Sequence, residues 1–528
     1  MLIYQLLPRR WGNPVEDPVK GGKVERNGCG TFSSVDGVSL KYLKDTGFTH
    51  VWYTGVIRHA TCCATRGCTP SDPSWVKGEA GSPYAITDYY DVNPYLADNP
   101  DRRMEEFRAL VERTHAAGLK VIIDFVPNHV ARDYGRHSDG THPVLGASDD
   151  RSVHWAPGND FFYYPGQPLR LPVPSNYVAD PERATGNCFS PFPGIHDWYE
   201  TIKLNYCDFH TPTWDKMLDA VLFWAGLGVD GFRCDMVELV PEAFFTWLIA
   251  QVKARFPGIV FIAEVYQKER YRAYIREVGF DLLYDKSGLY DALRAIVEKN
   301  VSDDGTPLEP WQSARRITWN WQEEGDLQAN LLNFLENHDE QRFASDFFGR
   351  SAGNTWAALY SSLLFGPESF MVYFGEEAGE RGMDAEGLSG PDGRTTIFDW
   401  WSVASLRRLY RQIHGEEGLT REEKPFWERF CSLIRLRAND PVFSAGQSYD
   451  LCYCNASSPG FDSDRHFAFL RAFGGRALLV FCNFSSSTST STVHIPDHAL
   501  EWLNLPAQTP RSLAVTVAPF DATIVRLI

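Results

Sequence analysis

Up to about residue 415 the chain alternates short apolar runs with longer amphipathic stretches. Eight runs are typical of strands, at 2–8, 50–55, 120–126, 229–235, 260–266, 280–285, 331–339 and 369–375. Most are separated by stretches that favour helices, such as 104–119 and 211–228, the second opening on Thr-Pro and closing on Gly. The alternation predicts a (β/α)8 barrel. A doubly wound open sheet shares the alternation, but the Gly-rich phosphate turn expected after its first strand is missing.

Two segments depart from this pattern. Residues 129–205 form a long Pro-, Gly- and aromatic-rich stretch without a clear helix, which we interpret as a subdomain inserted after strand three. Residues 425–528 follow a connecting helix and favour β structure, with two strands around a Gly-Gly turn at 467–486. We therefore predict a catalytic barrel over 1–128 and 206–424, and a C-terminal antiparallel β-sandwich over 425–528.

Composition narrows the possible partners. The 528 residues carry a net charge of −17, which disfavours nucleic acid and strongly anionic ligands and leaves neutral substrates. No apolar run approaches the length of about 18 residues that a membrane span needs. The first residues are too quickly charged for a secretory signal, so a cytoplasmic protein is expected unless a leader has been trimmed. Eleven cysteines without even spacing indicate mostly free thiols.

One cysteine cluster leaves its chemistry open. His59, Cys62, Cys63 and Cys68 lie within ten residues of one another, although their spacing matches no standard zinc pattern. A metal site and a single disulfide bridge remain alternatives to free thiols.

Polar side chains gather where four of the predicted strands end. They are Asp124, Asn128 and His129 after strand three, Arg233 and Asp235 on strand four, Glu264 on strand five, and Asn337, His338 and Asp339 on strand seven. Barrels of this kind carry their chemistry at these carboxyl ends. Each residue alone could be a solvated strand end or a local ion pair, but together they indicate one site.

Glycoside hydrolysis suits this set, because it needs two carboxylates beside the scissile bond. Arg233 and Asp235 are two positions apart on a strand and so share a face, where the cation would keep the carboxylate ionised. Glu264, in the apolar string FIAEVY, has a setting that would help an acid keep its proton.

Four strings, DFVPNH, GFRCD, IAEV and ENHD, resemble in order the four strand-end motifs of the α-amylase family of retaining glycosidases, glycoside hydrolase family 13. The resemblance covers about residues 1–415 and is supported by IYQLLPR, SPYAITDYYDVNP and VYFGEE. It implies Asp235 as nucleophile, Glu264 as general acid and base, Asp339 as stabiliser of the distorted sugar, Arg233 as orienting cation, His129 and His338 as hydroxyl ligands, Tyr84 as stacking platform and Asp124 as a structural member.

Three positions depart from the family pattern. Asn128 matches a ligand of the calcium ion that many members bind, but Lys203 stands where an Asp is usual, so calcium there is doubtful. Glu238 and Leu239 replace the Lys-His pair of typical α-amylases, which leaves the leaving-group preference open. Ala85 replaces the Asp that usually follows the loop tyrosine in single-sugar-trimming glucosidases.

We therefore expect a retaining hydrolase of α-1,4-linked glucose chains, such as starch, glycogen or maltooligosaccharides, that needs no cofactor for its chemistry. The alternatives are a transglycosylase or an α-glucosidase on the same machinery. A catalytically silent carbohydrate-binding relative would be expected to lack one of the three acids, and all three are present. The sequence does not decide between endo and exo attack or fix the oligomeric state.

Overall fold

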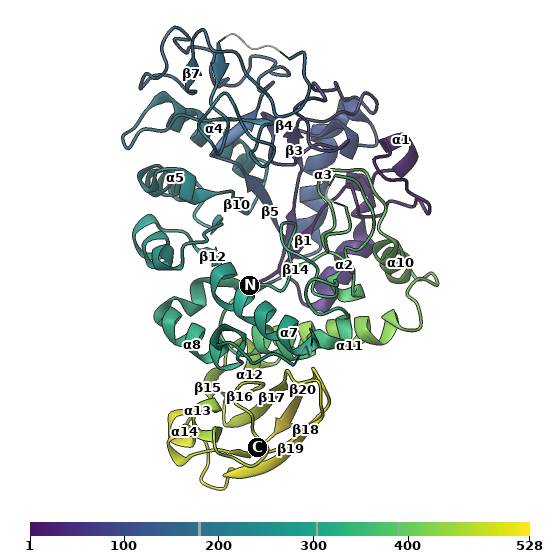
Figure 1. The fold of residues 1–528 in the computed structure, drawn as a ribbon, viewed down its shortest axis with the longest axis vertical. Helices are drawn as coiled ribbons and strands as arrows, with labels where there is room; N and C mark the ends of the chain where they lie inside the picture. Colours follow the sequence, from purple (N-terminus) through teal and green to yellow (C-terminus); the bar gives the residue numbers. More distant parts are fainter. Residues whose placement is uncertain (178–180, 303–304, 389) are drawn as a thin grey trace.

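Eight parallel strands form a closed barrel at the centre of the computed structural model (Figure 1). They are β1 (Leu2–Leu6), β2 (His50–Tyr53), β5 (Lys120–Phe125), β10 (Gly231–Cys234), β11 (Val260–Ala263), β12 (Leu282–Tyr284), β13 (Leu331–Asn333) and β14 (Ser369–Tyr373). Because β1 pairs with both β2 and β14, the ring closes and the predicted fold class is confirmed. The structure describes residues 1–177, 181–302, 305–388 and 390–528.

Helices surround the barrel and bury the outer faces of its strands (Figure 1). The longer ones are α2 (Gly37–Thr46), α3 (Arg103–Ala116), α4 (Pro212–Gly226), α5 (Glu242–Arg255), α7 (Asp291–Ser302), α8 (Arg315–Glu324), α9 (Trp356–Leu364), α10 (Ala404–Ile413) and α11 (Glu423–Asn439). Strands covered on both faces need continuous apolar runs, which explains the sequence pattern. Helix α4 begins as predicted, with Thr211 as an extended N-cap and Pro212 in the first position.

The predicted insert, which lies between β5 and helix α4, contains only short antiparallel pairs. Strand β6 (His129–Ala131) pairs with β9 (Thr201–Lys203), and β7 (Tyr163–Tyr164) pairs with β8 (Glu182–Arg183). No helix occurs among the described residues of 129–205, and residues 178–180 of the predicted insert lie outside the described residues. The β6–β9 pair joins the two ends of the insert.

A second hairpin was not predicted from the sequence. Strands β3 (Ile57–His59) and β4 (Ile86–Val92) pair antiparallel inside the β2–β5 connection, with register shifts at both steps. The irregular register and the three-residue length of β3 leave little periodicity for a sequence pattern to reveal. We call the segment between them, residues 60–85, the β3–β4 loop.

The C-terminal part is antiparallel, as predicted. Strands β15 (Gln447–Asp450), β16 (His466–Phe473), β17 (Arg476–Asn483) and β20 (Ala522–Arg526) form one sheet, and β18 (Ser489–His494) pairs with β19 (Ser512–Val517). The β16–β17 turn contains Gly474 and Gly475, both at positive φ, which such a tight hairpin requires. The segment predicted to begin at 425 starts inside helix α11, so its first strand lies about one helix later.

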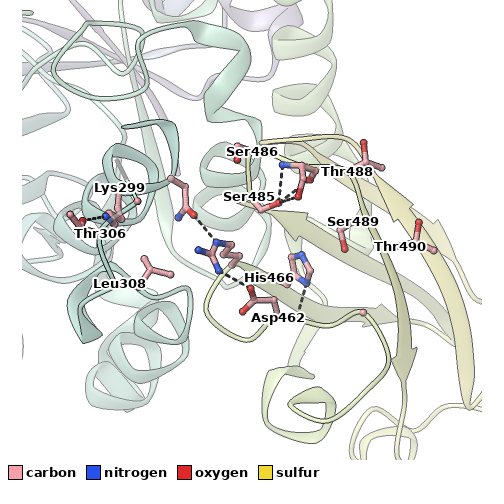
Figure 2. Close-up of a pocket in the computed structure, with 15 residues that line it drawn as sticks. Lys299, Thr306, Leu308, Asp462, His466, Ser485, Ser486, Thr488, Ser489 and Thr490 are labelled. Atoms are coloured by element: carbon pink, nitrogen blue, oxygen red, sulfur yellow. Dashed lines mark hydrogen bonds and ion pairs between the residues drawn. The ribbon is translucent and has the colours of Figure 1, made fainter. Parts of the chain in front are cut away.

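The C-terminal sheets and the insert lie at opposite ends of the molecule (Figure 1). The four-stranded sheet packs on the barrel through Phe365, whose ring lies 4.9 Å from that of Phe467 and 5.0 Å from that of Phe469. A cavity of about 630 Å³ between the two parts is lined by hydroxyl side chains from Ser485 to Thr490 (Figure 2). No helix in the described part of the chain is long and apolar enough to cross a membrane.

The contacts around the cysteine cluster decide between a disulfide bridge, a metal site and free thiols. All eleven cysteines are free thiols, so the cluster forms no disulfide bridge. The His59 ring is held by the Tyr95 hydroxyl at 2.7 Å and the Ala60 carbonyl at 2.8 Å. Among the described residues, no group of three or more His, Cys, Asp or Glu side chains is placed to hold a metal ion.

Candidate active site

The predicted residues meet at the carboxyl end of the barrel. Asp124 and Arg233 are register partners on β5 and β10. Asp235 and Glu264 each follow their strand by one residue and continue its ladder, donating backbone N–H bonds to Phe125 and Cys234. A cavity of about 300 Å³ opens here, lined by Tyr84, His129, Asp235, Glu264 and Asp339 among others. This cavity is smaller than the one beside the C-terminal sheet, but it holds the acids.

Arg233 joins the two principal carboxylates. Its side chain is fully buried, with Nη1 2.6 Å from an Asp235 oxygen and Nη2 2.8 Å from a Glu264 oxygen. Asp124 is more distant, at 3.9 Å from Nη1. The guanidinium carbon also lies 5.3–5.6 Å from the centres of three aromatic rings. The predicted shared face of Arg233 and Asp235 is present, and the cation additionally contacts Glu264.

Glu264 is buried, and its carboxyl group is surrounded by polar groups. One oxygen accepts the Tyr266 hydroxyl proton at 2.8 Å, and the other accepts the backbone N–H of Met236, also at 2.8 Å. The apolar setting expected from FIAEVY is therefore wrong, because the neighbouring apolar side chains point into the core while Glu264 points into the mouth. Met236 has φ 45° and ψ 47°, an uncommon left-handed conformation for a non-glycine residue that aims its N–H at Glu264.

A chain of hydrogen bonds orders the other side of the mouth. The Gln5 amide nitrogen donates to Nδ1 of His338 at 2.8 Å, which leaves the imidazole proton on Nε2. Nε2 lies 2.6 Å from the Tyr84 hydroxyl and 3.0 Å from Asp339. Tyr84 in turn donates to Asp124 at 3.1 Å. The Tyr84 ring stacks on His338 rather than standing alone, with ring centres 5.3 Å apart.

Protonation states follow from these contacts. Burial opposes ionisation of Asp339, but His338 and Arg233 outweigh it and lower its pKa to about 2. Burial, with Lys203 nearby, lowers the pKa of His129 to about 3, so its ring is neutral. Asp339 is therefore an anion and His129 a neutral hydrogen-bonding group throughout the physiological range.

Several lining residues were not predicted. Lys77, Ser82, Trp198, Glu200, Met236, Tyr266, Ile397 and Phe398 complete the cavity wall. Tyr266 could have been found, since it lies two residues after Glu264 and so faces the same side if the strand continues. The loop residues carry no such signal, because their positions depend on how distant loops meet.

Glu238, one of the departures from the family pattern, holds the loop that follows Glu264. Its two carboxylate oxygens accept the backbone N–H groups of Tyr266 at 2.9 Å and Gln267 at 3.1 Å. It thereby ties the loop after β11 to the loop after β10. The residue lies outside the cavity lining and acts on Glu264 through the backbone.

We predict an acidic limit for activity near pH 7. Burial raises the pKa of Asp235 to about 7, with Arg233 opposing the rise and the Glu264 carboxylate adding to it. Asp235 can attack only as a carboxylate, so the attacking form is lost as pH falls through this value. A pH profile of kcat/KM should therefore fall as pH drops below about 7. A profile that stays flat down to pH 5 would contradict the prediction.

Arg233→Lys is expected to lower kcat/KM by about 10²-fold. Lysine keeps the charge but cannot contact both carboxylates with a planar fork, so their relative position is lost. Steady-state kinetics on a maltooligosaccharide measures the loss, with the melting temperature as a check on folding. Wild-type kinetics in this variant would show that the double contact has no role in positioning.

This eight-stranded parallel barrel carries at its carboxyl mouth the pair of acidic side chains that glycoside hydrolysis uses. The chain belongs to the α-amylase family, because the family model for the α-amylase catalytic domain matches residues 5–446.

Individual relatives agree with this family. The chain is 27% identical over 452 residues to α-amylase MalA of Haloarcula japonica, covering 85% of this chain and 52% of that protein. It is 23% identical over 442 residues to neopullulanase 2 of Thermoactinomyces vulgaris, covering 81% of this chain and 64% of that protein. The chain thus spans only about half to two thirds of the length of these curated relatives.

Solved structures show the same fold. An α-amylase from Geobacillus thermoleovorans, solved with acarbose, superimposes with a TM-score of 0.63 at 19% identity, covering 100% of this chain and 98% of that one. A maltogenic α-amylase from Thermotoga neapolitana gives a TM-score of 0.60 at 20% identity, covering 100% and 96%.

Proposed function

We propose that this protein is a retaining glycoside hydrolase that cleaves α-1,4-glucosidic bonds in α-glucans or maltooligosaccharides. The observation that carries the proposal is the bridging of Asp235 and Glu264 by one guanidinium, at 2.6 and 2.8 Å. Two carboxyl groups held by one guanidinium fit the short separation of retaining enzymes better than the wider one that an inverting enzyme needs for its water. The close pair instead suits a nucleophile and an acid acting on one sugar carbon.

The reaction then runs in two displacements. The Asp235 carboxylate attacks the anomeric carbon while protonated Glu264 gives its proton to the departing oxygen, so a glycosyl-enzyme ester forms as the glycosidic bond breaks. Glu264, now a carboxylate, takes a proton from water, and the resulting hydroxide displaces Asp235. In this proposal Asp339 binds hydroxyls of the distorted sugar, His338 orients Asp339 at 3.0 Å, and neutral His129 lines the same cavity from the insert.

Transfer to a second sugar is the competing outcome of the same intermediate. Relatives of this chain include cyclomaltodextrin glucanotransferase of Geobacillus stearothermophilus, at 24% identity over 408 residues. A product profile on starch, pullulan, maltooligosaccharides, isomaltose and sucrose separates the two. Glucose and shorter chains from maltotriose support hydrolysis, whereas chains longer than maltotriose support transfer.

We also propose that Lys203 takes the place of the calcium ion found in many relatives. Its ammonium donates to the Asn128 side-chain oxygen and, at 2.9 Å, to the Leu239 carbonyl. The Lys203 nitrogen occupies the position among these acceptors that a hard cation would need, whether or not it is charged, since burial lowers its pKa to about 7. The two contacts join the insert to the loop after β10.

If Lys203 stands in for calcium, chelators should affect neither the stability nor the activity of the enzyme. Treatment with EDTA is expected to leave the melting temperature and kcat unchanged. Lys203→Met should lower the free energy of unfolding by about 1–3 kcal/mol, because the Asn128 and Leu239 oxygens lose their buried donor. Thermal unfolding with and without calcium measures both. A wild-type enzyme that loses activity in EDTA and regains it with calcium would overturn the proposal.

A further inference from the structure

The side of the mouth opposite Glu264 is closed by loops that the reaction does not use. In the ring order of the barrel, β11 is four strands away from β1 in either direction. The loops after β14, β1 and β2 therefore face Glu264 across the mouth. Because the acid protonates the leaving oxygen, the leaving sugar departs on the Glu264 side, and the non-reducing part of the substrate extends toward these loops.

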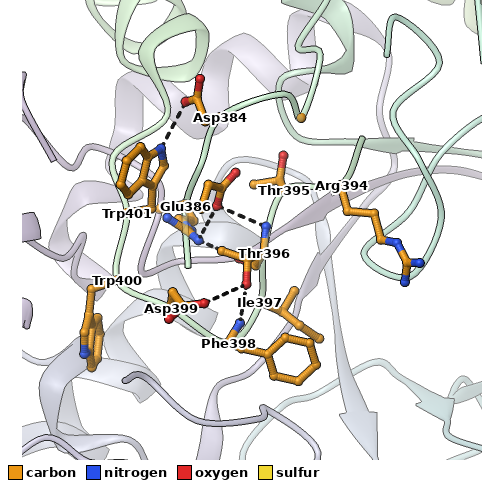
Figure 3. A network of polar contacts seen from close by, with 12 residues as sticks. Asp384, Glu386, Arg394, Thr395, Thr396, Ile397, Phe398, Asp399, Trp400 and Trp401 are labelled. Carbon is orange, nitrogen blue, oxygen red and sulfur yellow. Dashed lines mark hydrogen bonds and ion pairs between the residues drawn. The ribbon is translucent and has the colours of Figure 1, made fainter. Parts of the chain in front are cut away.

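Residues 396–399 of the loop after β14 are anchored by two arginines that follow β1. Arg10 donates to the Thr396 carbonyl at 2.5 Å and contacts Glu386 at 3.1 Å, and Arg9 donates to the Ile397 carbonyl. The Thr396 hydroxyl donates to a carboxylate oxygen of Asp399 at 3.3 Å and accepts the backbone N–H of Phe398 at 3.0 Å (Figure 3). Both arginines are buried. This part of the loop is thus anchored by buried hydrogen bonds, and Ile397 and Phe398 line the cavity.

The loop after β14 is joined directly to the β3–β4 loop. The Phe398 carbonyl accepts the backbone N–H of Ala80 at 2.9 Å and of Gly81 at 3.2 Å. Gly78 has φ +67°, and a Cβ there would lie 2.3 Å from the same carbonyl oxygen. Such close backbone approach requires glycine at this point. The two loops therefore form a continuous wall.

An ion pair extends this wall to the inserted segment. Lys77 of the β3–β4 loop lies 3.0 Å from Glu200 of the insert, and its ammonium stands 5.1 Å from the centre of the Tyr199 ring. Lys77 and Glu200 both line the cavity, and Glu200 is buried. Ring contact between Trp75 and Tyr177 adds a second join between the same two segments.

We propose that this wall, formed by Lys77, Glu200, Ile397 and Phe398, ends the glycone side of the site and makes the enzyme exo-acting. It would release one- or two-sugar units from the non-reducing ends of α-glucans. The cavity of about 300 Å³ is at the small end of the range for ligand pockets. Ala85 cannot provide the polar contact usual in single-sugar glucosidases, but Lys77 and Glu200 offer polar groups to a terminal hydroxyl from another position. The inference rests on the proposed hydrolase function.

Capped substrates test the wall. The purified enzyme is given 4-nitrophenyl α-maltopentaoside with a free non-reducing end, the same compound capped there by a 4,6-ethylidene group, and β-cyclodextrin, which has no end. Initial products are identified by mass spectrometry. We expect loss of one or two sugars from the free compound and at least a 100-fold lower rate on the other two. Equal rates on free and capped compounds would overturn the inference, whereas no cleavage of any compound would overturn the hydrolase function instead.

Shortening side chains of the wall should raise the ratio of the rate on the capped compound to the rate on the free compound. Phe398→Ala and Lys77→Ala are each expected to raise the capped-to-free rate ratio by about tenfold. The matched control is Phe473→Ala, an exposed phenylalanine at the β16–β17 turn, which should leave the ratio unchanged. If both wall variants retain the melting temperature and the wild-type ratio, these side chains do not bound the site and the inference fails.

Discussion

Replacing Asp235 by Asn is expected to lower kcat on maltooligosaccharides by about 10⁴-fold or more. The amide has the shape of the carboxylate but cannot form the ester with the sugar, so the first displacement has no nucleophile. Arg233, 2.6 Å away, would also lose the anion it holds. Steady-state kinetics with a purified variant gives the loss, and circular dichroism with thermal unfolding shows whether the fold is kept.

A matched control separates chemistry from folding in this experiment. Asp139→Asn removes a carboxylate from an exposed turn of the insert and should leave kcat unchanged. An Asp235→Asn variant that hydrolyses maltooligosaccharides at the wild-type rate would disprove the assignment of the nucleophile. Added azide offers a second check on an Asp235→Ala variant, because it can attack from the vacated side and give a product of inverted configuration.

Replacing Glu264 by Gln is expected to lower kcat/KM on maltooligosaccharides by about 10²–10⁴-fold. A sugar oxygen is a poor leaving group and needs the proton that Gln cannot give. Fluoride leaves without that help, so α-glucosyl fluoride should lose far less in the first displacement. The amide oxygen can still accept the Met236 N–H and the amide nitrogen can donate to the Tyr266 hydroxyl, but the Arg233 contact at 2.8 Å is lost, so the melting temperature of the variant is also measured.

The loss of activity on maltooligosaccharides, compared with the loss on α-glucosyl fluoride, decides the role of Glu264. A pre-steady-state burst of fluoride from the variant is expected, because the second displacement still lacks its base. The acidic limb near pH 7 should also move to lower pH in the fluoride-release profile, because the Glu264 charge that helps to raise the pKa of Asp235 is gone. Equal losses on both substrates would show that Glu264 acts by position or charge rather than as an acid.

The sequence was most informative where backbone rules fix side-chain direction. Asp124, Arg233 and Asp235 could be placed at one mouth because parallel strands end together and alternate residues share a face. The irregular β3–β4 hairpin was missed because its register shifts leave no alternation. The polar setting of Glu264 was also missed, since the N–H of Met236 comes from an unusual backbone conformation.

The loop wall could not be predicted for a different reason. Lys77 and Glu200 are separated by more than a hundred residues, and their contact depends on how the insert folds back over the barrel. Gln5 likewise lies inside the first strand, with nothing in its neighbours to indicate a bond to His338. Such contacts become visible only once the loops are placed in space.

Trapping the covalent intermediate tests the central claim most directly. The enzyme is incubated with a 5-fluoro-α-glycosyl fluoride, whose good leaving group lets the ester form while the ring fluorine slows its hydrolysis. Peptic digestion and mass spectrometry then locate the added mass. We predict one sugar attached to Asp235, in a peptide from the stretch VDGFRCDMVELV, residues 229–240. A sugar attached to another residue, or turnover with inverted configuration and no adduct, would contradict the account.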